Sequence, residues 1–116
     1  MDSTTPTPSP SSSTAVLPAS IIVPCYDEVR LIGPLLATLR GACDRLGLDL
    51  VVSDGGSTDG TIALARQYAH RVVVHTGPER QTIAAGRNAG ADAALGRVVV
   101  FFNADVTLPA DLDAFL

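Results

Sequence analysis

Short continuous apolar runs predict four β-strands along the chain. They lie at residues 20–23, 48–54, 71–75 and 97–102. Val, Ile, Leu and Phe fill most of their positions, and each run is too short for a helix. Pro24 closes the first run, where we expect that strand to end. Continuous apolar strands are typical of a parallel sheet that is covered on both faces.

Helical spacing of apolar residues separates these runs. The clearest example extends from about Arg30 to Leu46, where one side carries Leu31, Leu35, Leu39, Ala42 and Leu46. Three further helices follow: one from a cap at Ser57 or Thr58 to about Tyr68, one rich in small residues over 81–95, and one that opens at Pro109. Strands and helices therefore alternate along the chain.

This alternation predicts an α/β fold of Rossmann-like type. Helices should cover both faces of one parallel sheet. Right-handed crossovers leave few topologies, and the strand order 3-2-1-4 is the one expected. A ligand crevice then lies at the carboxyl ends of the strands, near the switch between the first and the fourth strand.

Composition divides the chain and excludes some functions. Residues 1–18 are rich in Ser, Thr and Pro and predict a disordered tail, so the folded domain should cover 19–116. Eight Arg, no Lys and twelve acidic residues leave no basic stripe, which argues against nucleic acid as a partner. No apolar run approaches the roughly 18 residues of a membrane span, and a secretory signal pattern is lacking. We therefore expect a cytoplasmic chain with reduced thiols.

Polar residues gather just after three of the predicted strands. Residues 24–28 follow the first strand, 53–59 the second and 103–105 the fourth. In a doubly wound sheet, these segments converge on one crevice. The chain therefore predicts a single site in which Asp and Glu outnumber fixed cations, with Arg87 as the main cation.

Two common phosphate motifs do not fit this site. Gly55–Thr61 has the glycine spacing of a P-loop but no lysine, and the first strand is not followed by G-x-G-x-x-G. An acidic site holds a phosphorylated ligand when a divalent cation such as Mg²⁺ or Mn²⁺ bridges the two. Asp105 is the best candidate metal ligand and Asn103 a weaker one. Asp54 is better suited to accept hydrogen bonds from a nucleobase or ribose.

Four motifs in order give the chain a resemblance to the family 2 glycosyltransferases, which have the GT-A fold. The motifs are S-I-I-V-P-C-Y-D-E at 20–28, V-V-S-D-G-G-S-T-D-G-T at 51–61, G-R-N-A-G at 86–90 and F-F-N-A-D at 101–105. The last one resembles the D-x-D element of that family. The match covers the half of such an enzyme that binds the nucleotide sugar.

The resemblance implies a role for individual residues. It places Pro24, Tyr26 and Glu28 in the nucleotide pocket, Asp54 at the base (typically uracil), Arg87 near the diphosphate or sugar, and Asp105 on the metal, with Asn103 beside it. It implies transfer of a sugar, of the hexosyltransferase type, from a UDP-sugar or similar donor, with inversion. The catalytic base of the family comes after the D-x-D element, so we expect it beyond Leu116.

The chain departs from the family pattern at Asp27, Gly55 and Asn103, where the family has Asn, Asp and Asp. It also stops soon after Asp105, which suggests a truncated enzyme. Two alternatives are a nucleotide-binding module without turnover and an unstable fragment. A sugar nucleotidyltransferase would need a Gly-rich loop with a basic residue after the first strand, which is absent. The acceptor and any membrane association of a longer parent protein are left open.

Overall fold

The computed structural model of the chain describes residues 17–105 and 108. Its elements are β1 (Leu17–Cys25), α1 (Val29–Leu46), β2 (Asp49–Asp54), α2 (Thr61–Tyr68), β3 (Arg71–Val74), α3 (Ile83–Ala93) and β4 (Gly96–Phe101). The four strands form one parallel sheet in the order β3-β2-β1-β4. The predicted alternation and strand order are confirmed. The helix predicted from Pro109 lies outside the described residues.

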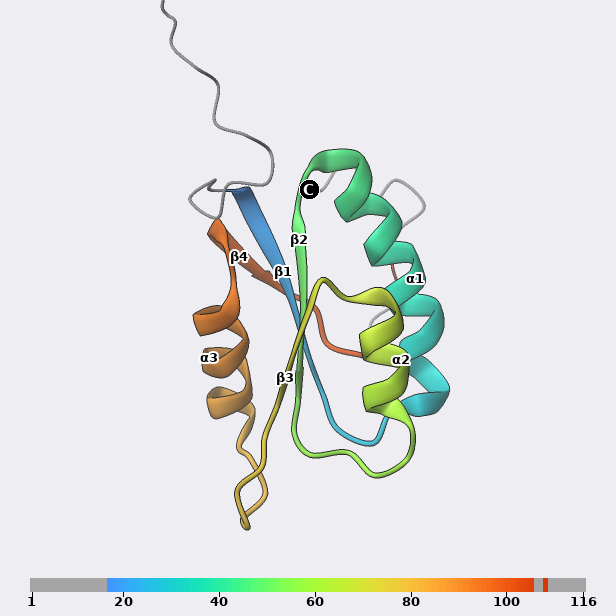
Figure 1. Ribbon diagram of the computed structural model, residues 1–116, viewed down its shortest axis with the longest axis vertical. Coiled ribbons are helices and arrows are strands. Elements are labelled where there is room, and N and C mark those ends of the chain that lie inside the picture. The colour runs from blue at the N-terminus through green and yellow to red at the C-terminus, as the bar shows by residue number, and fades with distance from the viewer. Residues whose placement is uncertain (1–16, 106–107, 109–116) are drawn as a thin grey trace, which may run out of the picture.

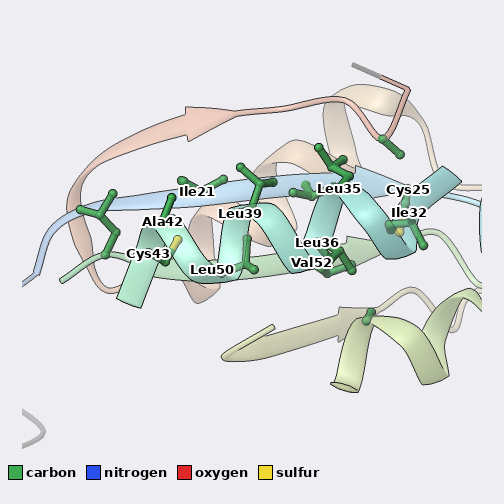
Figure 2. Close-up of a cluster of buried hydrophobic side chains, with 14 residues drawn as sticks. Ile21, Cys25, Ile32, Leu35, Leu36, Leu39, Ala42, Cys43, Leu50 and Val52 are labelled. Atoms are coloured by element: carbon green, nitrogen blue, oxygen red, sulfur yellow. The ribbon is translucent and has the colours of Figure 1, made fainter. Parts of the chain in front are cut away.

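The helices lie on both faces of the sheet, as expected. Helices α1 and α2 cover one face, and α3 covers the other (Figure 1). The main core forms between α1 and the sheet, where the apolar side of α1 meets Ile21, Leu50 and Val52 (Figure 2). Leu31 and Leu46, which the helical pattern placed on this side, are exposed. Gly47 ends α1 in the left-handed conformation that glycine adopts without strain.

Small residues let α3 approach the sheet closely. A side chain at Gly90 would collide with Ile22 of β1. One turn earlier, the carbonyl of Gly86 accepts a hydrogen bond from Ser53 Oγ at 2.6 Å. These contacts fix α3 across β1 and β2, with its first turn beside the carboxyl ends of the strands.

Strand β1 is longer at both ends than predicted. It begins at Leu17, so the last two residues of the predicted tail belong to the sheet, and residues 1–16 lie outside the described part. It also continues through Pro24, which has no N–H to donate. Pairing persists because the next carbonyl, that of Cys25, accepts the Gly55 N–H at 2.9 Å.

The predicted start of α2 is wrong, because neither Ser57 nor Thr58 caps this helix. Gly60 precedes it in a left-handed conformation, and the helix begins at Thr61. Asp59 Oδ1 accepts the Thr61 N–H at 3.0 Å. Ser57 instead uses its hydroxyl in contacts between loops, which are described below.

Helix α3 is two residues shorter at each end than its predicted range. Thr82 caps it by accepting the Ala85 N–H at 3.1 Å. Over residues 17–105 and 108, the helices all lack the combination of length and apolar composition needed to cross a membrane.

Candidate functional site

A cavity of about 370 Å³ opens at the carboxyl ends of β1, β2 and β4. Its volume is in the range of small-molecule sites. The predicted site residues that line it are Pro24, Tyr26, Glu28, Arg87, Asn103 and Asp105. Asp54 is the predicted site residue that the structure does not bring into the lining. The topological switch between β1 and β4 therefore holds the site where the strand order placed it.

The turn after β1 is tied to the loop after β2 by hydrogen bonds in both directions. The Asp27 N–H donates to Ser57 Oγ at 2.8 Å, and the Thr58 N–H donates to Asp27 Oδ1 at 2.9 Å. Asp27 itself has a φ of 49°. Asp and Asn tolerate this left-handed conformation better than most residues do. The turn therefore fixes where Tyr26 and Glu28, on either side of Asp27, enter the cavity.

Glu28 is held by both its backbone and its side chain. Its N–H donates to Thr61 Oγ1 at 2.9 Å, and its Oε1 accepts the Tyr26 N–H at 3.2 Å. A carboxylate has two oxygens and accepts several hydrogen bonds. Glu28 therefore keeps acceptor capacity on the cavity side.

Asp54 organises the loop after β2 and is fully buried, with 0% of its surface exposed. Its carboxylate accepts the N–H groups of Gly56 and Ser57 at 2.8 and 2.7 Å, and the Ser57 hydroxyl at 2.7 Å. Cys25 Sγ is a further donor, at 3.4 Å. The role of Asp54 in this structure is to shape the loop beside the cavity, and its contact with a base stays a prediction.

Cys25 lines the cavity as a neutral thiol. Its side chain is buried beside the Asp54 carboxylate. Burial, and after it the negative charge of Asp54, raises the pKa of the Cys25 thiol far above its ordinary value. The Cys25 thiol therefore serves as a hydrogen-bond donor to Asp54.

The segment after β4 presents two polar side chains around a buried anchor. Ala104 is buried in the hydrophobic core, whereas its neighbours Asn103 and Asp105 are exposed and line the cavity. The Phe102 N–H donates to the Ile22 carbonyl at 3.0 Å, which extends the pairing of the two strands to this point. The anchor therefore directs both oxygen-bearing side chains to the same cavity.

Two arginines reach the cavity, and sequence reasoning identified one of them. Arg87 lies over the Phe101 ring, with Cζ 5.5 Å from the ring centroid. Arg80, in the loop between β3 and α3, lies over the Tyr26 ring at 4.5 Å. Gln81, Thr82 and Ile83 of the same stretch also line the cavity. The sequence could have indicated this stretch, because it follows β3 and the carboxyl end of β3 lies at the same edge of the sheet as the other strand ends.

A second hollow of about 320 Å³ adjoins the first on the β3 side. The residues that line both are Tyr26, Gly55 and Arg80. The rest of its wall is Gly56 and the loop 75–79. His75 shapes this loop, because its Nε2 lies 2.7 Å from the Glu79 carbonyl oxygen. The site therefore has two compartments that meet at Tyr26.

The oxygen donors of the main cavity fit a hard divalent cation. Glu28, Asn103 and Asp105 all line it. Within residues 17–105 and 108, no group of three or more His, Cys, Asp and Glu side chains is placed to hold a metal ion. Mg²⁺ does not need such a group, because it binds through one or two carboxylates together with substrate phosphates and water. The donor set therefore suits a metal that arrives with a phosphorylated ligand.

Comparison with known proteins identifies the family of this fold. The family model described as glycosyl transferase family 2 matches residues 20–114. The succinoglycan biosynthesis protein ExoA of Rhizobium meliloti (strain 1021) is 36% identical over 95 residues, which are 78% of this chain and 29% of that protein. The chain spans about a third or less of the length of the curated relatives it matches.

Solved structures of two similar proteins share the architecture at more than 25% sequence identity. The mannosyltransferase PcManGT of Pyrobaculum calidifontis, in complex with GDP-Man and Mn²⁺, superimposes with a TM-score of 0.69 at 33% identity, over 88% of this chain and 31% of that one. TarS of S. aureus, in complex with UDP, superimposes with a TM-score of 0.63 at 27% identity, over 77% and 28% of the two chains. The expected GT-A fold is confirmed.

Proposed function

The chain belongs to glycosyl transferase family 2, and from this premise we propose that it binds the donor in an enzyme that transfers a sugar from a nucleoside diphosphate to an acceptor. The four motifs of this chain correspond to residues that bind the donor in the family. We propose that the acceptor site is formed by sequence outside these 116 residues. A UDP-sugar is the donor that the motifs predict. Similar proteins bind UDP in one case and GDP-Man in another.

The observation that carries this proposal is the meeting of three strand ends in one cavity. An aromatic ring, Tyr26, enters from the β1 turn, and the pair Asn103 and Asp105 enters after β4. Arg87 of α3 lines the same cavity. A planar apolar surface, oxygen donors for a metal and a cation are the groups that a nucleoside diphosphate requires.

Asp105, with Asn103 beside it, would hold Mg²⁺ or Mn²⁺ together with the diphosphate. When bound, such a cation neutralises charge on the departing nucleoside diphosphate. Arg87 adds a fixed positive charge to the same group. Pro24 and Tyr26 orient the nucleoside, and Glu28 accepts hydrogen bonds from sugar hydroxyls. We propose inversion at the anomeric carbon. The catalytic base, which takes the proton of the acceptor hydroxyl, is proposed to come from outside these 116 residues.

Calorimetric titration of the 116-residue chain with UDP and with GDP, each with and without Mn²⁺, tests this proposal. We expect binding of one of the two that strengthens at least tenfold with Mn²⁺. Asp105→Ala should abolish the gain from Mn²⁺. Asp92→Ala removes the same charge from an exposed position of α3 and should leave binding unchanged.

The outcomes separate the proposal from its alternatives. If the chain is folded by circular dichroism and binds neither nucleotide, the donor site is refuted. If it is unfolded, the chain does not bind a donor by itself. Equal response to Mn²⁺ in the parent and in Asp105→Ala would remove the metal assignment.

A second candidate is a binding module without turnover, because the motifs of this chain belong to the nucleotide-sugar-binding half of the family pattern. Release of UDP from UDP-glucose in the presence of the chain distinguishes the two. Release above the Asp105→Ala background indicates an enzyme, and binding without release indicates the module.

A further inference from the structure

Arg80 stands at the border between the two hollows of the site. It lines both of them, together with Tyr26 and Gly55. It comes from the loop between β3 and α3, whereas Tyr26 follows β1. Its guanidinium therefore bridges segments that are far apart in the sequence.

The guanidinium covers the Tyr26 ring. Its Cζ lies 4.5 Å from the ring centroid, which is a cation–π contact. Gly55 also lies against the ring, since a Cβ added at Gly55 would lie 3.2 Å from Tyr26 Cδ1. A planar ligand that stacks on the face of the ring beneath Arg80 has to displace the guanidinium. Arg80 and such a ligand compete for this face.

A diphosphate bound in the main cavity would need a cation, because the lining of the cavity carries negative charges. Two of the groups that line the cavity, Glu28 and Asp105, are carboxylates that repel an anion. A guanidinium binds phosphate oxygens through a planar pair of N–H donors, and this contact is much stronger than a cation–π contact at an open site. A diphosphate in the cavity therefore draws Arg80 away from Tyr26.

We propose that Arg80 links recognition of the diphosphate to stacking of the base on Tyr26. This inference rests on the proposed function. A nucleoside alone has to displace the guanidinium without compensation. A nucleoside diphosphate gives the guanidinium a new partner and frees the ring in the same event. Arg80 is therefore the residue that makes the site select nucleoside diphosphates against free nucleosides.

The test compares each diphosphate with its own nucleoside in the presence of Mn²⁺. UDP and uridine, and in parallel GDP and guanosine, are titrated into the parent chain and Arg80→Ala, with binding followed by NMR. We expect Arg80→Ala to weaken diphosphate binding at least tenfold and to leave nucleoside binding equal or up to several-fold tighter. The ratio of the two affinities should therefore fall at least tenfold.

Two further variants keep the result interpretable. Arg66→Ala removes the same charge from an exposed position of α2, and its ratio should equal that of the parent. Arg80→Lys keeps the charge without the planar donor pair, and its ratio should fall between those of the parent and Arg80→Ala.

Failure of this inference differs from failure of the proposed function. If the parent binds a diphosphate and Arg80→Ala keeps the same ratio, Arg80 has no coupling role although the donor site stands. If both affinities fall equally in Arg80→Ala, the residue supports the pocket without selecting, which also overturns the inference. If the parent binds neither UDP nor GDP, both proposals fall.

Discussion

Two buried carboxylates stand at opposite ends of the same strand, and their surroundings differ. Asp49 begins β2 and Asp54 ends it, with exposed fractions of 1% and 0%. Asp49 forms an ion pair with Arg71 of β3. The donors around Asp54 are N–H groups and a hydroxyl of the following loop, with one thiol. One carboxylate has a cation as its partner, and the other has a loop folded around it.

The Asp49 end fastens the sheet together. Its Oδ2 accepts the Ser20 hydroxyl of β1 and the Leu95 N–H ahead of β4, both at 3.0 Å. The Gly96 N–H donates to Ser20 Oγ at 2.7 Å. One carboxylate therefore connects β2 with every other strand of the sheet. Within the described residues, Arg71 Nε is the buried side-chain atom of this cluster that has no hydrogen-bond partner.

The Asp54 end instead leaves polar side chains free for a ligand. The carboxylate uses its oxygens to fix a loop, and that loop supports the turn that carries Tyr26 and Glu28. The comparison teaches that a buried charge does not by itself mark a site. The distinction lies in whether the polar groups around the carboxylate link strands or support the lining of a cavity.

The largest expected effect comes from Asp54→Ala. Donors of Gly56 and Ser57 would be left without their acceptor, and hydrogen bonds to a charged group contribute about 1.5–3 kcal/mol. We expect a loss of stability in that range by urea unfolding, together with weaker UDP or GDP binding. Asp54→Asn retains one acceptor oxygen and should lose less of both. Unchanged binding in a folded Asp54→Ala would show that the loop does not support the site.

Arg71→Ala should lower stability without affecting nucleotide binding. It leaves the Asp49 charge buried without its cation. Breaking a fully buried pair costs about 3–5 kcal/mol. Because the Arg71 side chain is 35% exposed, we expect about 2 kcal/mol by urea unfolding. The exposed Arg66→Ala is the matched control. If Arg71→Ala is folded and still loses nucleotide affinity, the claim that the Asp49 end of β2 stabilises the sheet without supporting the site is contradicted.

Acid should weaken the Asp49 end. Burial acts to raise the pKa of Asp49, but hydrogen bonds from Arg71, the Leu95 N–H and Ser20 outweigh it and hold the pKa below its ordinary value. A depressed pKa contributes stability above the ordinary value of about 4, and this contribution is lost as the pH falls through the folded-state pKa. Urea unfolding from pH 6 to pH 3 should show a shallower decline in Asp49→Asn than in the parent or in Asp92→Asn. If the free energy of unfolding declines equally with pH in Asp49→Asn and in the parent, Asp49 does not contribute to the acid sensitivity.

The smallest effect is expected at the cap of α3. Thr82→Ala removes the acceptor for the Ala85 N–H, and loss of such a cap costs about 1 kcal/mol. Because Thr82 also lines the cavity, nucleotide affinity should fall several-fold. Thr82→Ser keeps the hydroxyl and should restore both readouts. A Thr82→Ala chain with parental stability would mean that the cap contributes nothing.

The sequence was sufficient for the sheet and for most of the cavity. Alternating apolar runs and helical patterns, combined with right-handed crossovers, predict the order 3-2-1-4. That order brings Tyr26 and Asp105 together, although they are far apart along the chain. Local pattern and general topology suffice for these two residues.

The remaining features depend on contacts between loops. The Ser57 hydroxyl does not cap a helix. It donates to Asp54 and accepts the Asp27 N–H, and no local sequence pattern indicates such contacts. Arg80 lies in a loop without periodicity, so its place over Tyr26 follows from the fold alone. In the sequence, Asp49 is an ordinary polar residue near the start of a strand. Its role follows from the sheet register, which pairs it with Ser20 of β1 and places β3, the strand of Arg71, on the other side of β2.

The central claim is that the nucleoside diphosphate binds at the carboxyl ends of the strands, between Tyr26 and Asp105. A crystal structure of the 116-residue chain grown with Mn²⁺ and the nucleotide that it binds tests this directly. The account predicts the base beside Tyr26 and the diphosphate near Asp105, with Arg80 moved off the ring. A nucleotide bound away from this cavity would contradict the account.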